Sequence, residues 1–201
     1  GVLSLGYGAG AKSTQAIASI QYGVELTDDE VQHLVGVYRT KNYMVPRMWN
    51  TVEAALNRMV AGYNGSMLGA NGDMYFYDGN YTVAGARLPA IRLPDGVWVT
   101  FPNLRSEIKV KHNRSFTSLI YDDIKGKVAK PASVWGGSAT GILVQATAFA
   151  LMKHQGLQLM RYGLRPALNT HDEFAIIVPE AYTDTAEKLL STAMTSVPDW
   201  L

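Results

Sequence analysis

Residues 164–179, "LRPALNTHDEFAIIVP", decide how the last part of the chain folds. An apolar run leads up to His171, Asp172 and Glu173, and a second apolar run follows them. Two β-prone runs separated by a polar break predict a pair of antiparallel strands, and a proline near each end marks the limits of the unit. The segment therefore predicts a β-hairpin with adjacent acids at its tip.

The two acids at this tip indicate metal chemistry. Neighbouring residues of a strand point to opposite faces, so only one of Asp172 and Glu173 is expected to hold a metal ion directly. Mg²⁺ takes one or two protein carboxylates, and phosphate oxygens and water complete its shell. The hairpin therefore fits phosphoryl transfer, and a solvated polar turn without chemistry is the alternative interpretation.

The composition is that of a globular protein. The chain has 201 residues, of which 47% are hydrophobic, and its formal net charge is +1. It contains no cysteine, which excludes disulfides and thiolate metal sites. No apolar run approaches the roughly 20 residues that span a bilayer, so we expect no membrane partner and a cytoplasmic location.

Positive charge gathers in the middle of the sequence, although the whole chain is nearly neutral. Such a run is either a solvated face or an electrostatic surface for a polyanion. Its members are Lys109, Lys111, His112, Arg114, Lys125, Lys127 and Lys130.

The first third of the chain predicts helices. A Gly-rich segment around Tyr7 precedes a helical pattern over residues 12–22. Thr27 and Glu30 form a capping-box pattern that starts a helix over residues 28–39. Residues 45–59 repeat apolar side chains at helical spacing, and their Met and Trp stripe is expected in the core.

The middle third predicts loops and strands. Residues 62–80, rich in Gly, Asn and Tyr, are typical of a long surface loop or lid. Short runs of β-branched and aromatic residues follow, and they predict an antiparallel sheet of two or three strands with a hairpin turn at Asp95-Gly96.

A long helix is predicted between Gly136 and Gly163, with a last helix before Pro198. The long helix is apolar around most of its circumference, so we expect it to be largely buried. Gln145 lies on its apolar stripe and would need a hydrogen-bond partner, either a backbone group or a substrate. Helix, hairpin and helix together predict an α+β fold.

Several segments, in order, resemble one family. "LGYGAGAK", "VQATAFALM" and "THDEFAIIVPE", with the "LPDGVWVTFP" hairpin between the first and second, resemble the C-terminal part of family A (DNA polymerase I-like) polymerases, most closely the phage-type branch. "WGGSATGILVQA" is similar to that branch's Tyr-Gly-Gly-Lys-Leu-Val-Glu-Asn segment. "YRTKNYMVPRMWNTVEAA" is similar to its Arg-Xaa-Xaa-Tyr-Pro…Trp…Glu-Xaa-Ala segment. The resemblance covers essentially the whole chain.

The resemblance implies a template-directed DNA-dependent DNA polymerase of phage DNA replication. Residues 1–130 would belong to the fingers, and residues 131–201 to the C-terminal part of the palm, with the hairpin as motif C. Asp172 matches the metal-binding catalytic aspartate, Glu173 its neighbouring acid, and His171 the residue that contacts the primer end.

Four further positions match binding residues of that family. Tyr7 and Gly8 match the Tyr-Gly at the end of the fingers helix, beside the nascent base pair. Leu3 stands where many relatives carry an aromatic residue against the sugar of the nucleotide. Gln145 matches a glutamine that contacts DNA at the nascent end of the duplex.

The resemblance also implies groups outside this sequence. The family's second metal-binding aspartate, in motif A, would lie ahead of Gly1, so the two-ion Mg²⁺ site would be incomplete here. Ser138, Gly141 and Ile142 replace the Lys, Glu and Asn of the phage pattern. We therefore expect a fragment that is inactive alone. Its partners would be a DNA primer-template, a deoxynucleotide and the remaining polymerase segment, in the cytoplasm of a host cell.

Two alternatives belong to other functional classes. One is a non-catalytic nucleic-acid-binding module that uses the basic middle segment with Tyr and Trp stacking. The other is a metal-dependent hydrolase built on His171, Asp172 and Glu173, to which only His154 lies close in sequence as a further ligand.

Overall fold

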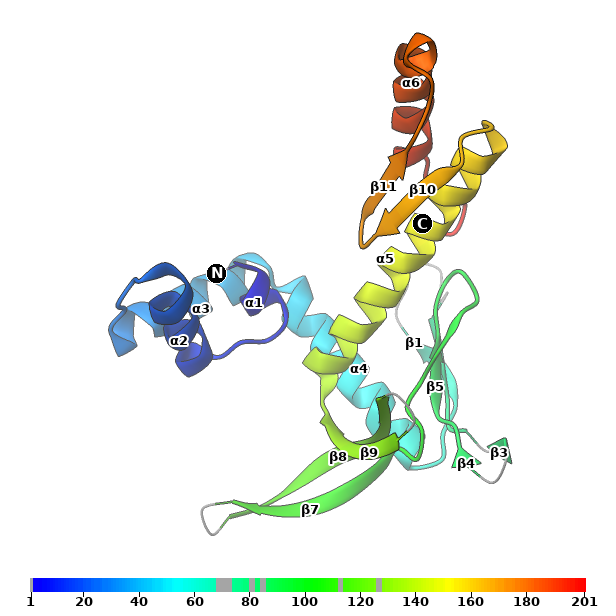
Figure 1. The fold of residues 1–201 in the computed structure, drawn as a ribbon. Helices are drawn as coiled ribbons and strands as arrows, with labels where there is room; N and C mark the ends of the chain where they lie inside the picture. The colour runs from blue at the N-terminus through cyan, green and yellow to red at the C-terminus, as the bar shows by residue number, and fades with distance from the viewer. Residues whose placement is uncertain (1, 68–73, 80–81, 84–85, 112–113, 126–127) are drawn as a thin grey trace. The chain divides into compact units, whose positions relative to one another are not determined.

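The computed structural model describes residues 2–67, 74–79, 82–83, 86–111, 114–125 and 128–201 (Figure 1). The chain divides into two compact units, Gly1–Leu143 and Val144–Leu201. Helices and antiparallel sheets make up the fold, which confirms the α+β class. The division into fingers and palm at residue 130 stays a prediction.

The first unit begins with helices. The capping box is present, because the Glu30 N–H donates to Thr27 Oγ1 and the Thr27 N–H donates to Glu30 Oε2 at 2.8 Å. These bonds satisfy amide groups that a helix start leaves without partners, which confirms the predicted helix. The helices are α1 (Val2–Gly6), α2 (Ala11–Tyr22), α3 (Asp28–Lys41) and α4 (Met44–Val60).

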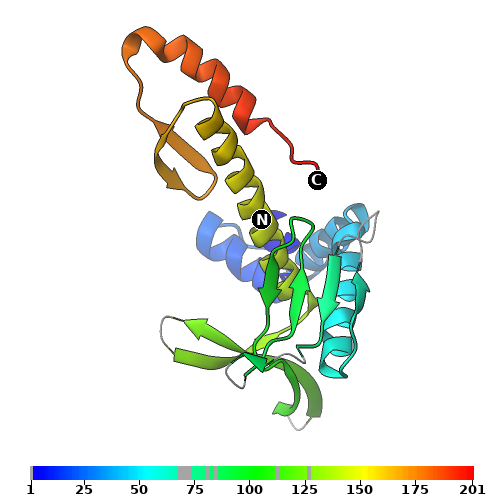
Figure 2. The ribbon, with the colours of Figure 1, turned by 90° about the vertical axis from the view of Figure 1, so that its right-hand side faces the viewer.

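Helix α4 supplies much of the core of this unit. Val52, Leu56 and Met59 are fully buried, as the apolar stripe of the sequence predicts. Burying each such side chain stabilises the fold by about 1.5–3 kcal/mol. The helix packs against strands β1 (Gly65–Met67) and β2 (Met74–Tyr77), beside which it runs in Figure 2.

Strands β1 and β2 correct the expectation of an irregular loop over residues 62–80. They pair antiparallel and continue into β5 (Ala90–Arg92) and β6 (Trp98–Thr100), in the order β1-β2-β5-β6. Tertiary pairing overrides the weak local preference here, because Phe76 of β2 is buried in the core. Residues 68–73 and 80 of that predicted loop lie outside the described residues.

The predicted turn at Asp95-Gly96 is confirmed. It joins β5 to β6, Gly96 has φ +87°, and the Val97 N–H donates to Asp95 Oδ1 at 3.1 Å. The basic middle of the chain forms a second sheet rather than extending the first. Its strands, in the order β7-β8-β9, are β7 (Arg105–Lys111), β8 (Arg114–Lys125) and β9 (Val128–Val134), and a separate short pair is β3 (Thr82–Val83) with β4 (Ala86–Arg87).

The second unit contains most of the long helix and the hairpin. Helix α5 (Gly136–Arg161) ends in a Schellman motif, in which the N–H groups of Gly163 and Leu164 donate to the carbonyls of Met160 and Leu159. Gly163 has φ +78°, which confirms the predicted glycine cap. The remaining elements are β10 (Pro166–Thr170), β11 (Glu173–Ile176), the 3₁₀ turn η1 (Glu180–Tyr182) and α6 (Thr183–Met194).

The expectation that α5 is largely buried is wrong for its second half. Phe149 is 69% exposed and Met160 is 60% exposed, whereas Met152 and Leu159 are buried. The helix is apolar around its circumference, so its sequence pattern does not tell which side is covered.

Candidate functional site

The hairpin predicted for residues 164–179 is present in the second unit. Strands β10 and β11 pair antiparallel, and Thr170 opposite Glu173 leaves His171 and Asp172 as a two-residue turn. His171 has φ +53°, and two-residue hairpin loops favour a positive φ in the turn. His is one of the few non-glycine residues that adopt this conformation readily.

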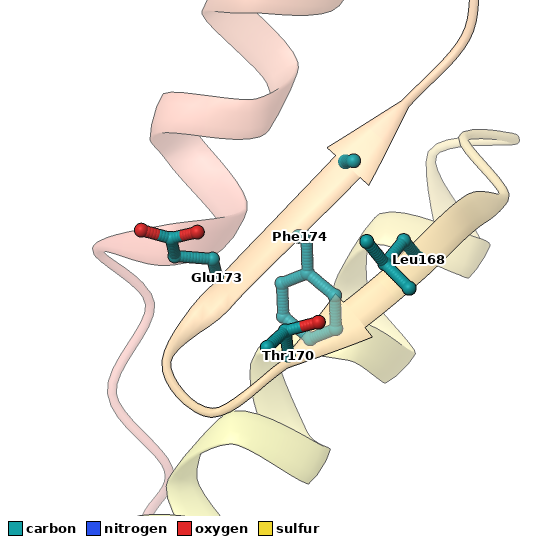
Figure 3. A pocket seen from close by; sticks show the side chains of 5 residues that line it. Leu168, Thr170, Glu173 and Phe174 are labelled. Atoms are coloured by element: carbon teal, nitrogen blue, oxygen red, sulfur yellow. The ribbon is translucent and has the colours of Figure 1, made fainter.

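The turn presents its polar side chains to solvent. His171, Asp172 and Glu173 are all exposed. Glu173 and Phe174 point to opposite sides of β11 (Figure 3). The ring of Phe174 faces Gly156 of α5, whereas Leu168, the cross-strand partner of Ala175, shares the face of Glu173. Asp172 stands in the turn itself, outside both strands, so the opposite directions expected for the two acids stay a prediction.

The hollow beside the turn is too small for a nucleotide. It has a volume of about 60 Å³ and is lined by Leu168, Thr170, Glu173, Phe174 and Ala175. Ligand pockets commonly measure about 300–1,000 Å³. The hairpin therefore does not enclose a ligand of that size by itself.

The carboxylates supply the right type of donor for Mg²⁺ but not a complete site. Within the described ranges, no group of three or more His, Cys, Asp or Glu side chains could hold a metal ion. Asp172 alone can supply one oxygen ligand, which matches an ion that takes one or two carboxylates. The same finding argues against a self-contained hydrolase built on His171, Asp172 and Glu173.

Gln145 does not have the surroundings expected for it. Its side chain is exposed, and the buried glutamine of α5 is Gln155, which is 7% exposed. Gln155 Nε2 donates to the carbonyl of Met194 at 2.7 Å and so ties α5 to the last residue of α6. Gln145 therefore needs no internal partner and is available to a ligand.

The second predicted cluster, around Tyr7 and Gly8, lies in the first unit. Gly8 follows α1 with φ +86°, and a Cβ atom at this position would collide with the indole of Trp135. A Cβ atom at Gly137 would collide with the same ring. Trp135 therefore lies in a slot bounded by two glycines, and we call Tyr7, Gly8, Trp135, Gly137 and Gly141 the glycine-aromatic cluster.

Tyr7 completes this cluster. A Cβ atom at Gly141 would lie 3.0 Å from Tyr7 Cδ1, so the phenol ring packs on the first turns of α5. Tyr7 is 43% exposed and Trp135 is 44% exposed, so both residues remain accessible to solvent. The structure thus brings together the "GYG" and "WGG" segments, which lie far apart in the sequence.

The cluster is fastened to α4. Trp135 makes an edge-to-face contact with Trp49, whose ring centroid is 5.7 Å away. The Gly136 N–H donates to Glu53 Oε2, which supplies a partner at the start of α5. The guanidinium group of Arg39 lies over the ring of Trp49, with Arg39 Cζ 5.8 Å from the ring centroid.

Trp135, Gly137 and Glu53 were not singled out by the sequence reasoning as functional residues. Exposed aromatic residues next to glycines were the available signal, in "GYG" and "WGG", but spacing alone does not bring them together. Leu3 lies in α1, and its side chain is outside the part of the chain that the structure describes.

The chain is similar to the DNA polymerase of Bacillus phage SP02. The two sequences are 25% identical over 179 residues, which is 88% of this chain and 26% of that polymerase. The chain therefore spans about a quarter of the length of this relative. No protein-family profile matches the chain, and no solved structure matches it. None of the helices within the described ranges is long and apolar enough to span a membrane.

Proposed function

We propose that this chain is the nucleotide- and primer-binding part of a template-directed DNA polymerase. The observation that carries the proposal is the similarity to the phage SP02 DNA polymerase, which runs over 88% of the chain. This similarity supports a DNA polymerase role in general. Assignment to family A, to its fingers and palm, and to phage DNA replication in a host cytoplasm is the finer part of the proposal.

The hairpin would provide the catalytic acids. Asp172 would be a metal ligand, and Glu173 would be its neighbouring acid. His171, which precedes them in the turn, would contact the end of the primer. The exposure of all three side chains supports these roles, because the reacting groups must approach from outside the unit.

The glycine-aromatic cluster would hold the incoming deoxynucleotide. Tyr7 and Gly8 would lie beside the nascent base pair, and Leu3 would face the sugar. Base stacking on aromatic rings is worth about 1–3 kcal/mol, and Tyr7 and Trp135 both remain accessible to solvent. Gln145 would contact DNA near the same end of the duplex.

Mg²⁺ would complete the site only with help from outside this chain. When bound, Mg²⁺ would stabilise the negative charge that develops as the primer hydroxyl attacks and pyrophosphate leaves. Asp172 can hold an ion from one side, whereas the family pattern places the second aspartate ahead of Gly1. We therefore expect the isolated chain to be inactive, and its partner to be the remaining polymerase segment.

Primer extension tests the proposal. The purified chain is assayed with Mg²⁺, primer-template and deoxynucleotides, first alone and then with the polypeptide encoded just upstream. We expect extension only in the mixture, and we expect Asp172→Asn to abolish it. Asp199→Asn, which changes an exposed acid outside the hairpin, is the matched control and should retain extension.

Two results would contradict this proposal. Extension by the chain alone would show that no second carboxylate is needed. Primer-template binding without extension in any mixture would favour the second candidate, a non-catalytic nucleic-acid-binding module. The positively charged β7-β8-β9 sheet supports that candidate independently of the hairpin. Binding of nucleic acid by this sheet would need no Mg²⁺.

A further inference from the structure

Strand β8 belongs to two ribbons at once. Its first part pairs with β7, from Arg105 opposite Ile120 to Lys111 opposite Arg114, and its second part pairs with β9. Leu119 and Ile120, where the two pairings overlap, are buried at 4% and 2% exposure. We call β7 with residues 114–120 of β8 the β7–β8 ribbon, which is the long green hairpin of Figure 1.

Both faces of the β7–β8 ribbon carry exposed side chains among its described residues away from this overlap. Ile108 and Val110, on one face, are 77% and 71% exposed. Lys109 and its cross-strand partner Phe116 lie on the other face, and Phe116 is 46% exposed. A two-stranded ribbon with so much open apolar surface is typical of an element that docks on a partner.

Positive charge is concentrated on this sheet. Residues 105–134 contain seven Lys and Arg against three Asp and Glu, whereas the rest of the chain contains eleven against fourteen. Two of the three acids, Glu107 and Asp122, are held by Arg105 at 2.8 and 3.0 Å. The third, Asp123, lies opposite Lys130 in the backbone register of β8 and β9, outside the β7–β8 ribbon.

The outer part of the ribbon therefore has no acid to balance its cations. Residues 108–121 contain Lys109, Lys111 and Arg114 and no Asp or Glu. Lys109 Nζ donates to Ser133 Oγ at 2.6 Å, which is a neutral partner and leaves the charge in place. In the backbone register, Lys111 lies opposite Arg114, two residues along the ribbon from Lys109 opposite Phe116.

We propose that the β7–β8 ribbon docks on the sugar-phosphate backbone of duplex DNA. A two-stranded ribbon fits the major groove, which is about 12 Å wide, and cations along it would neutralise phosphates on its edges. Phe116 and the exposed aliphatic residues would lie against sugars. The binding is independent of sequence and of polymerase chemistry, so it stands apart from the hairpin and the glycine-aromatic cluster.

Fluorescence anisotropy tests this inference with the full chain. The probe is a labelled duplex of mixed sequence and about 20 base pairs, roughly two helical turns, titrated at about 50 to 200 mM salt without Mg²⁺ or nucleotide. The ribbon variant carries Lys109→Gln, Lys111→Gln and Arg114→Gln. The control variant carries Lys41→Gln, Lys153→Gln and Lys188→Gln, which remove the same charge from exposed lysines elsewhere.

We expect the ribbon variant to lose at least about tenfold in affinity, while the control stays within about threefold of the unmodified chain. The slope of log K against log salt should fall by about 2–3 in the ribbon variant, because each phosphate contact contributes about 0.9. Equal losses of affinity in both variants would show that only the net charge of the chain matters, and would overturn the inference. An unchanged affinity in the ribbon variant would also overturn it.

A single strand of the same length separates duplex docking from general phosphate binding. We expect weaker binding of the single strand, and little difference between the two variants on it. A single strand that binds as tightly and loses as much in the ribbon variant would contradict groove docking. A thermal unfolding midpoint equal to that of the unmodified chain verifies that each variant is folded. These outcomes do not depend on primer extension.

Discussion

Trp135 shows how a single side chain can decide the shape of a candidate site. Its indole fits only because Gly8 and Gly137 have no Cβ atom to occupy the slot. Gly8 also needs its left-handed backbone, with φ +86°, whereas Gly137 has a helical backbone that any residue can adopt. A substitution at Gly137 therefore tests the space beside the indole alone, without a change in backbone conformation.

Gly137→Ala should move the indole and destabilise the first unit by about 1–3 kcal/mol, the usual result of overpacking. Chemical denaturation monitored by tryptophan fluorescence measures both effects. Gly36→Ala is the matched control, because no atom lies within 4 Å of a Cβ atom at this helical position. It should stabilise the fold by about 0.5–1 kcal/mol. Equal behaviour of the two variants would contradict the slot.

The two glutamines of α5 offer a second matched pair. Gln155 is buried and donates to the Met194 carbonyl, whereas Gln145 is exposed on the same helix. Gln155→Ala should lower the free energy of unfolding by about 1–3 kcal/mol, because it leaves that carbonyl without its donor. Gln145→Ala should change it by less than about 0.5 kcal/mol. Urea denaturation compares them, and a larger loss at Gln145 would reverse the assignment.

At the scale of elements, the capping box of α3 predicts a dependence on pH. The backbone N–H of Thr27 and then its hydroxyl hold the pKa of Glu30 below its ordinary value. A carboxyl whose pKa is lower in the folded chain stabilises it above the unfolded pKa, and that contribution is lost as the pH falls through the folded pKa.

Glu30→Gln should therefore lower the thermal midpoint near pH 7, while the difference from the unmodified chain should shrink toward about pH 3. Differential scanning calorimetry over this pH range measures the difference. Glu25→Gln, at an exposed acid that precedes the box, is the control for general charge effects. A difference that grows toward low pH would have the wrong sign for this interaction.

The elements that the sequence predicted well are those with strong local signals. Thr27 with Glu30, the buried stripe of α4 and the hairpin around His171 each depend on residues close in sequence. Strands β1 and β2 depend instead on pairing with β5 and on burial of Phe76, and β9 contains Pro131, which weakens a strand signal. Pro131 is tolerated because β9 is an edge strand.

The candidate site was predictable only in part, for a related reason. The acids of the hairpin are neighbours in sequence, so their joint exposure at a turn follows from local patterning. The contact of Trp135 with Gly8 joins segments that are far apart in the sequence, and no sequence periodicity predicts it. Gln145 and Gln155 could not be ranked by burial, because α5 is apolar around much of its circumference.

At the scale of the whole molecule, the second half of α5 leaves apolar side chains uncovered. Phe149, Leu157 and Met160 lie near one face of the helix and are 48–69% exposed. Exposed apolar patches of this kind occur at protein, membrane and ligand-binding surfaces.

Phe149→Ser should reduce binding of a hydrophobic fluorescent dye and leave the unfolding midpoint nearly unchanged. Met152→Ser, at a buried position of the same helix, should instead destabilise the chain by about 2–5 kcal/mol. Dye fluorescence and thermal unfolding of both variants make the comparison. A strong loss of stability in Phe149→Ser would show that this side chain is covered.

Because β7 and β9 both pair with β8, a change in the register of β8 affects both ribbons. Side chains alternate between faces along a strand, so a slip of one residue in β8 would turn over both ribbons together. Leu119 and Ile120 pair with both partners and are buried, so they fix the alignment of β8 with β7 and with β9. Inserting or deleting one residue near this point would turn the following side chains of β8 to the opposite face, so that β8 could keep its present faces toward only one of its two partners.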